Sequence, residues 1–329
     1  MIRLLIIRLV GAMATLLAVS VIVFGATEVL PGDVAAAVLG REATPESLRV
    51  LRRNMHLEDP AYDRYGRWLW QMAQGNPGVS LAASSFILTD NNESSIEGVP
   101  VTTLIGDKLK NTAVLTLVTT LLMIPLSVIF GVWSAIRRDR LADRTISTIT
   151  LVLISVPEFV TATLLVLLFS LVWPVLPAVS LIDPSRSLFS QTNVLVLPVL
   201  ALLAAILAQT IRMVRASVLQ VLQSEYVQAA RLKGIQERHV LRRYVLPNAL
   251  GPTIQVFAVN IAWLVGGVII VETVFQYPGL GALLVDAVSK RDIPTVQAIS
   301  LLIAVGYIAI NLVADIVTVL VNPKLRTSL

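Results

Sequence analysis

Long apolar runs alternate with short polar segments along this chain of 329 residues. A helix needs about 20 mostly apolar residues to cross the hydrocarbon core of a bilayer. Six runs reach that length, at residues 9–30, 111–136, 145–173, 194–214, 250–272 and 295–321. The first stays apolar over residues 9–27, longer than the roughly 7–15 residues of a signal-peptide core, which favours a retained helix. The pattern predicts an all-α polytopic membrane protein with six transmembrane helices.

The spacing of these runs predicts one transmembrane domain over residues 1–329. Helix 1 would occupy residues 1–30 and a large loop region residues 31–110, within which the polar stretch 82–98 is expected to be a mobile insertion. The core helices 2–6 would fill residues 111–321, with a charged loop at about 215–249 and a short tail at 322–329.

Basic residues are distributed unequally between the two sides of this layout. Short cytoplasmic loops carry an excess of Lys and Arg, whereas loops longer than about 60 residues cross regardless of charge. The loops opposite the termini hold only Arg186, Lys290 and Arg291, apart from the long segment 31–110. The side of the termini holds Arg3, Arg8, Arg137, Arg138, Arg140, Arg144, Arg212, Arg215, Arg231, Lys233, Arg238, Arg242, Arg243, Lys324 and Arg326. We therefore predict cytoplasmic termini, a cytoplasmic loop at 215–249 and an external loop at 31–110.

Composition supports the membrane assignment and narrows the chemistry. The chain is 56% hydrophobic and 14% charged, whereas soluble domains carry about 25% charged residues. Membrane lipid is thus an expected partner. The basic residues are dispersed among apolar runs, so no nucleic-acid partner is expected. The absence of cysteine excludes disulfides and thiolate sites, and two distant histidines make a histidine metal cluster untenable.

Residues 225–250, EYVQAARLKGIQERHVLRRYVLPNAL, form a charged stretch between two apolar runs. A short helix is predicted over 225–234, with Ser224 as its N-cap and Gly234 as the left-handed residue that stops it. The acidic start and the basic end match the helix dipole. Pro247 favours a break before the fifth span.

Two interpretations of this short helix remain open from the residues alone. Ala229 and Ala230 would leave a smooth patch for close approach of a partner, and Tyr226 would supply an aromatic anchor of the kind enriched at interfaces. Alternatively, the segment is an ordinary solvated loop helix whose basic residues keep it inside the cell.

Motifs for several catalytic classes are missing. A phosphate-binding loop needs GxxxxGK[ST], and the chain contains no Gly-Lys dipeptide. HExxH and GxSxG are absent as well. Any ATP chemistry that drives this protein is therefore expected in another chain.

Polar side chains inside the apolar runs are candidates for a transport pathway, because they are costly at membrane depth. Glu158, beside Pro157, lies near the middle of the third run, where we expect it to face the route and favour a cationic substrate group; a packing role is the alternative. Gln209 and Asn260 are weaker candidates, suited to interhelical hydrogen bonds. Glu272 ends the fifth run, where water at the interface would reduce its cost.

The charged stretch resembles the cytoplasmic "EAA" loop of ABC-importer permeases, whose pattern is Glu-Ala-Ala, three residues, Gly, nine residues and Ile-x-Leu-Pro. The form EYVQAARLKG is similar to the dipeptide/oligopeptide branch. Residues 30–81 resemble the outer segment of that branch and residues 271–298, VETVFQYPGLGALLVDAVSKRDIPTVQA, its loop between spans five and six. Gln228 stands where the pattern has Glu, and Tyr244 where it has Ile. The matching register is Gln228, Ala229, Ala230, Gly234, Tyr244, Leu246 and Pro247.

The resemblance implies a non-catalytic permease subunit of type I fold in a bacterial inner membrane. It implies a second homologous permease, two ATPase subunits that bind ATP and Mg²⁺, and an external solute-binding protein, with no cofactor on this chain. Substrates of the branch include peptides, nickel, opines, glutathione and oligosaccharides, and Glu272 with the following PGLG turn would shape the outer gate. The expected ATPase-docking residues are Glu225, Tyr226, Gln228, Ala229, Ala230, Arg231, Lys233 and Gly234.

Two other functional classes compete with this interpretation. An ion-coupled secondary transporter or channel would need several buried carboxylates or broken helices near the midplane, and only Glu158 is a convincing central carboxylate. A membrane enzyme lacks a recognisable nucleophile, metal set or phosphate cradle. Co-purification with ATPase subunits would distinguish the importer from a self-contained transporter.

Overall fold

A computed structural model describes residues 2–29, 44–54, 58–83, 85–88, 94–182 and 190–321. The chain divides into two compact units, which are described separately. The core unit comprises Met1–Leu9, Thr112–Pro278 and Gly306–Leu329, and the loop unit comprises Val10–Asn111 and Gly279–Val305. The prediction of a single domain over 1–329 stays a prediction.

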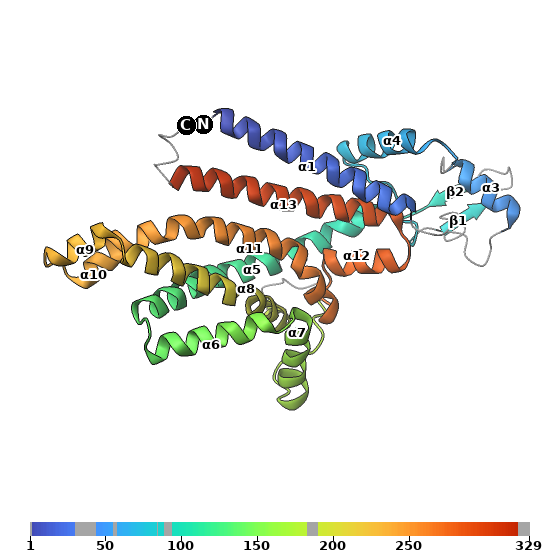
Figure 1. The fold of residues 1–329 in the computed structure, drawn as a ribbon. Coiled ribbons are helices and arrows are strands. Elements are labelled where there is room, and N and C mark those ends of the chain that lie inside the picture. Colours follow the sequence, from blue (N-terminus) through green and yellow to red (C-terminus); the bar gives the residue numbers. More distant parts are fainter. Residues whose placement is uncertain are drawn as a thin grey trace. The chain divides into compact units, whose positions relative to one another are not determined.

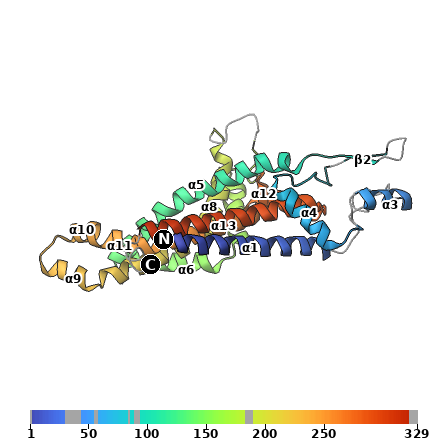
Figure 2. The same cartoon turned by 90° about the horizontal axis from the view of Figure 1, so that it is seen from above.

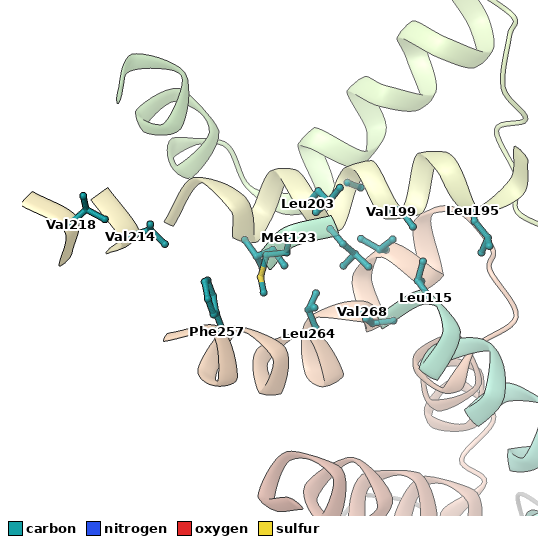
Figure 3. Packing of buried hydrophobic residues seen from close by; sticks show 14 of the residues in the cluster. Leu115, Met123, Leu195, Val199, Leu203, Val214, Val218, Phe257, Leu264 and Val268 are labelled. Atoms are coloured by element: carbon teal, nitrogen blue, oxygen red, sulfur yellow. The ribbon is translucent and has the colours of Figure 1, made fainter. Parts of the chain in front are cut away.

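The core unit is built around α8 (Thr192–Leu222), against which α6 (Leu141–Ser155), α7 (Glu158–Val166) and α11 (Leu246–Val274) pack (Figure 1). Apolar side chains four residues apart lie on one face of a helix, and α8 uses Leu195, Val199 and Leu203 in this way. In Figure 3 these face α11 and the later part of α5 (Val101–Ile136). The buried cluster includes Leu115 and Met123 of α5 and Phe257, Leu264 and Val268 of α11.

A glycine sets the close packing of α5 on α8. A Cβ built on Gly131 would lie 2.7 Å from both Cβ and Cγ1 of Val214, well inside the 3.5–4.0 Å or so of ordinary carbon contacts. Gly266 and Gly267, whose pairing suggested another close helix contact, do not serve this purpose. Gly266 has open space around it, and Gly267 faces the ring of Trp263 in its own helix.

The predicted third span, residues 145–173, is wrong as a single straight helix. It divides into α6 and α7, which are bent by 102° at Val156 and Pro157. Val156 is extended, with φ −94° and ψ 125°, because proline disfavours the α conformation in the residue before it. A π-helix, η2 (Leu167–Val172), continues α7. Among the described residues, five helices are long and apolar enough to cross a membrane, and the bent pair gives a sixth if it is one span.

A second proline interrupts the hydrogen bonding of α8. Pro198 has no N–H to donate to the carbonyl of Val194, four residues earlier. Ser180 Oγ donates to that carbonyl at 2.6 Å, and Ser180 N–H donates to the carbonyl of Phe275 at 2.8 Å. The segment before α8 thereby satisfies the group that the proline frees.

The ends of the chain meet within the core unit. Arg8 in α1 (Ile2–Val29) contacts Asp315 in α13 (Ile293–Val321), with Nη1 and Oδ2 2.6 Å apart. Arg8 belongs to the basic residues that precede the first apolar run, so this ion pair places the first and last helices side by side at that end.

The loop unit contains α3 (Pro45–Asn54), α4 (Ala61–Ala73), α12 (Leu280–Ser289) and parts of α1, α5 and α13. α4 packs on α1: Phe24, Tyr65 and Trp68 form an aromatic cluster with ring centroids 5.4–5.9 Å apart. Tyr65 shares a 2.8 Å hydrogen bond with Ser20. Gln297 of α13 donates to Thr27 of α1 at 2.7 Å, which joins a third helix to the pair.

Two short strands interrupt the predicted insertion at 82–98. β1 (Ser85–Leu88) pairs antiparallel with β2 (Ser94–Glu97), with Ser85 opposite Glu97 and Leu88 opposite Ser94. The expectation of a wholly irregular segment is therefore wrong for these residues, because SFIL and SSIE are short stretches that the span search overlooks. Apart from this hairpin and the isolated bridge between Val79 and Pro100, the described secondary structure is helical.

Candidate functional site

The predicted short helix forms as α9 (Glu225–Leu232), immediately after α8. Only Gln223 and Ser224 separate the two helices. Ser224 has the extended backbone of an N-cap, and its carbonyl accepts the N–H groups of Val227 and Gln228. Its hydroxyl, however, donates to the carbonyl of Val221 at 2.6 Å rather than capping α9. Ser224 thus bonds to α8 through its side chain and to α9 through its backbone.

The end of α9 follows the prediction. Gly234 is left-handed, with φ +76°, and its N–H donates to the carbonyl of Arg231 at 2.9 Å. The N–H of Ile235 donates to the carbonyl of Ala230 at 3.3 Å. These two bonds make the Schellman arrangement, which satisfies the last carbonyls of a helix and needs a residue that tolerates positive φ.

The two alanines do not form one exposed patch, as the sequence suggested. Ala230 is buried together with Val227, so this face of α9 packs on the core. The opposite face exposes Ala229, Tyr226 and Leu232. Leu232 is 89% exposed, a residue that sequence reasoning missed although its position four after Gln228 places it on the outer face. The remaining predicted docking residues, Glu225, Gln228, Arg231, Lys233 and Gly234, are exposed.

The chain returns to the fifth span through α10 (Glu237–Val240) and the π-helix η4 (Leu241–Val245). In Figures 1 and 2, α9 and α10 lie together beyond the ends of α8 and α11. Arg231 Nε donates to Glu237 at 3.0 Å, and this hydrogen bond raises the pKa of Arg231. The predicted break occurs as η4 just before Pro247, which is near the start of α11. The loop is therefore a closed helical turn with a basic exposed surface, including Arg238, Arg242 and Arg243.

A buried ion pair joins α6 to α8. Asp143 accepts hydrogen bonds from Nε and Nη2 of Arg215, at 2.7 and 2.8 Å. The same carboxylate accepts the hydroxyl of Ser134 and the N–H of Asp139, so α5 and the α5–α6 turn are held as well. Asp143 and Arg215 are 72 positions apart, and no local pattern in the sequence pairs them.

Glu158 is the least satisfied of the candidate pathway residues. It begins α7 just after the bend and is half-buried. Its Oε1 is buried and has no hydrogen-bond partner among the described residues. Such a group is costly in an apolar setting, which keeps Glu158 a candidate for contact with a ligand or a neighbouring subunit.

The other three pathway candidates have different surroundings. Glu272 is fully buried, so the expectation of a water-exposed interface position is wrong; it accepts the hydroxyl of Thr112 at 2.6 Å. Asn260 is buried and donates to the carbonyl of Val256 within its own helix, at 2.8 Å. Gln209 lies on the exposed side of α8. No hydrogen bond in the described part of the chain links Glu158, Gln209 and Asn260 to one another.

Comparison with known proteins places this geometry in a family. A model described as "Binding-protein-dependent transport system inner membrane component" matches residues 127–327, and a model of the N-terminal part of the same component matches residues 1–116. The chain belongs to this family. It is a transmembrane permease subunit of an ABC importer, as the six-span pattern and the charged loop predicted.

Two relatives show how much of the chain is shared. A probable peptide ABC transporter permease protein of Sinorhizobium fredii is 31% identical over 319 residues, which is 97% of each chain. The glutathione transport system permease protein GsiC of Escherichia coli is 34% identical over the same share of both chains. A crystal structure of an amino acid ABC transporter covers 68% of this chain and 94% of that chain, with a TM-score of 0.47 and 18% identity.

Family membership fixes the coarse setting of the permease. Members are inner membrane components of binding-protein-dependent systems, so this permease works with a solute-binding protein and with ATPase subunits. Its helices, fold class and location in an inner membrane follow from the family and from the described spans.

Proposed function

We propose that this permease pairs with a second, homologous permease and that two ATPase subunits move the pair by binding α9. The support is the build of α9. It is stopped at both ends, joined to α8 by two residues, and packed on the core through Val227 and Ala230. The observation that carries the proposal is Leu232, whose exposed apolar side chain on the outer face needs a covering partner.

The orientation proposed for the permease puts α9 and both termini in the cytoplasm. Its support is the excess of basic residues on that side of the chain, which normally faces inward. ATP and Mg²⁺ would then be bound and hydrolysed by the partner subunits, with no cofactor on this permease. The loop region 31–110 would face outward, toward the solute-binding protein.

The proposed substrate is a peptide or a related small solute, delivered by the solute-binding protein. Relatives named for peptide and for glutathione transport support this class, and glutathione is itself a small peptide. Glu158, as an unsatisfied carboxylate, suits an ammonium group on such a substrate. Glu272 and the turn after it would contribute to the outer gate.

The test of docking is the Leu232→Ser substitution in the purified complex. Burial of a leucine side chain contributes about 1.5–3 kcal/mol, so its loss should weaken ATPase binding by about tenfold or more. Leu181→Ser is the matched control, because Leu181 is 68% exposed but precedes α8 at its other end. Unchanged ATPase binding in Leu232→Ser, or equal loss in both variants, would remove α9 as the docking surface.

A second measurement tests the energy source. Vesicles containing the complete system should take up substrate with ATP after an ionophore has collapsed the ion gradient. Gradient-dependent uptake by this chain alone would replace the importer by a secondary transporter.

A further inference from the structure

Asp292 is a buried carboxylate in the loop unit, at the turn between α12 and α13. It is 2% exposed and immediately precedes α13, where its main-chain carbonyl accepts the N–H of Val296 at 2.9 Å. The preceding Arg291 has φ +56°, so the backbone enters the turn in a left-handed conformation. Among the described residues, no basic side chain forms an ion pair with Asp292.

Three hydrogen bonds converge on this carboxylate. Thr295 Oγ1 donates to Oδ2 at 2.7 Å, within the first turn of α13. Leu81 N–H donates to Oδ1 at 3.0 Å, and the hydroxyl of Ser80 donates to Oδ2. Leu81 lies 211 positions earlier in the chain, and Ser80 is buried as well. The carboxylate therefore fastens residues 80–81 to the α12–α13 turn.

Residues 78–81 are the base from which the hairpin β1–β2 arises. Ser80 N–H donates to the carbonyl of Val99 at 3.0 Å, and Val101 N–H donates to the carbonyl of Gly78 at 3.1 Å. The segment before the hairpin is thus paired with the segment after it, directly at the start of α5. Through Ser80 and Leu81, Asp292 holds this paired base, and with it both ends of the hairpin segment.

A buried carboxylate with no counter-charge is a costly way to pack two segments together, since removing the charge from water is unfavourable. An apolar side chain would fill the same site without that cost. What the carboxylate adds is direction: two separate acceptor atoms fix a main-chain N–H and a hydroxyl at defined positions. Such an arrangement sets the position of the hairpin base relative to α12 and α13 rather than merely covering it.

We propose that Asp292 and Ser80 are positioning residues that link the solute-binding protein to the transport cycle. In this arrangement a solute-binding protein seated on the loop segment 79–100 displaces the α12–α13 turn, because the Ser80–Asp292–Leu81 junction moves the two as one piece. The inference rests on the proposed function and names the route by which the delivery partner acts on that same permease.

The experiment uses the complete complex in lipid nanodiscs and compares its ATPase rate with and without the cognate solute-binding protein loaded with substrate. A hydrogen bond to a charged group contributes about 1.5–3 kcal/mol, which corresponds to roughly tenfold or more in an equilibrium. We expect Ser80→Ala to reduce the stimulation by the binding protein by about tenfold and to leave the unstimulated rate unchanged. Thr295→Val is the matched control, because it removes the local bond to the same carboxylate and leaves the junction to residues 80–81.

Conservative replacement adds a second readout. Asp292→Asn keeps an oxygen for Leu81 N–H and an amide that Ser80 can accept, so it should retain more of the stimulation than Asp292→Ala. The proposal is overturned if Ser80→Ala keeps the stimulation ratio of the unaltered complex, or if its stimulated and unstimulated rates fall in proportion, as a general loss of folding would cause. If the unaltered complex shows no stimulation by any binding protein, the proposed function itself fails, and that outcome is seen before any variant is made.

Discussion

The contact between Gly131 and Val214 gives the sharpest test of the packing of α5 on α8. In Gly131→Ala the new methyl group would lie 2.7 Å from two carbons of Val214 and 3.0 Å from the carbonyl oxygen of Ile211. Carbon contacts are normally about 3.5–4.0 Å, so the helices must separate by roughly 1 Å. Val214 is fully buried and cannot swing away. Overpacking of this kind costs about 1–3 kcal/mol.

The control for this substitution is Gly266→Ala in α11, where nothing lies within 4 Å of the new methyl group. Both variants gain the same helix propensity, about 1 kcal/mol, so their difference isolates the clash. The assay is unfolding of the purified chain by sodium dodecyl sulfate, followed by the fluorescence of its five tryptophans. We expect Gly131→Ala to be less stable than Gly266→Ala by about 1–3 kcal/mol. Equal stability of the two would show that the α5–α8 contact is not close in the membrane.

Three further predictions concern the ion pair, the orientation and the pathway. Asp143→Asn leaves Arg215 without its counter-charge and should lower the unfolding free energy by about 1.5–3 kcal/mol in the same assay; no change would mean that water already replaces the pair. Because the chain has no cysteine, a single cysteine at Gln236 can be labelled cleanly, and an impermeant reagent should reach it only from the cytoplasmic side. Labelling from outside alone would reverse the proposed orientation. Glu158→Gln should slow uptake of cationic substrates more than neutral ones, and equal rates would leave Glu158 a packing role.

Features that depend on neighbours in the sequence were predicted well. Apolar length located the spans, and the order of capping and stop residues located α9, with Gly234 in the required left-handed conformation. The same local reasoning failed where the outcome depends on what a helix packs against. Ala229 and Ala230 are adjacent and alike, yet only Ala230 faces the core, and the sequence holds no mark of the difference.

Long-range pairs explain the rest of what sequence reasoning missed. Glu272 looked like an interface residue because it ends an apolar run, whereas Thr112, 160 positions earlier, supplies the hydrogen bond that accompanies its burial. Asp143 with Arg215 and Ser80 with Asp292 are likewise pairs of ordinary residues that only folding brings together. Pro157 was recognised as a possible kink, but the size of the bend follows from the packing of α7 on α8 and α11.

The joint of two residues between α8 and α9 has a mechanical consequence. α8 has 31 residues and is therefore about 46 Å long at 1.5 Å per residue. A lever of that length that pivots by about 5° at one tip carries its other tip through about 4 Å. With so little slack at the elbow, small angular strokes on one side of the bilayer become side-chain-sized displacements on the other.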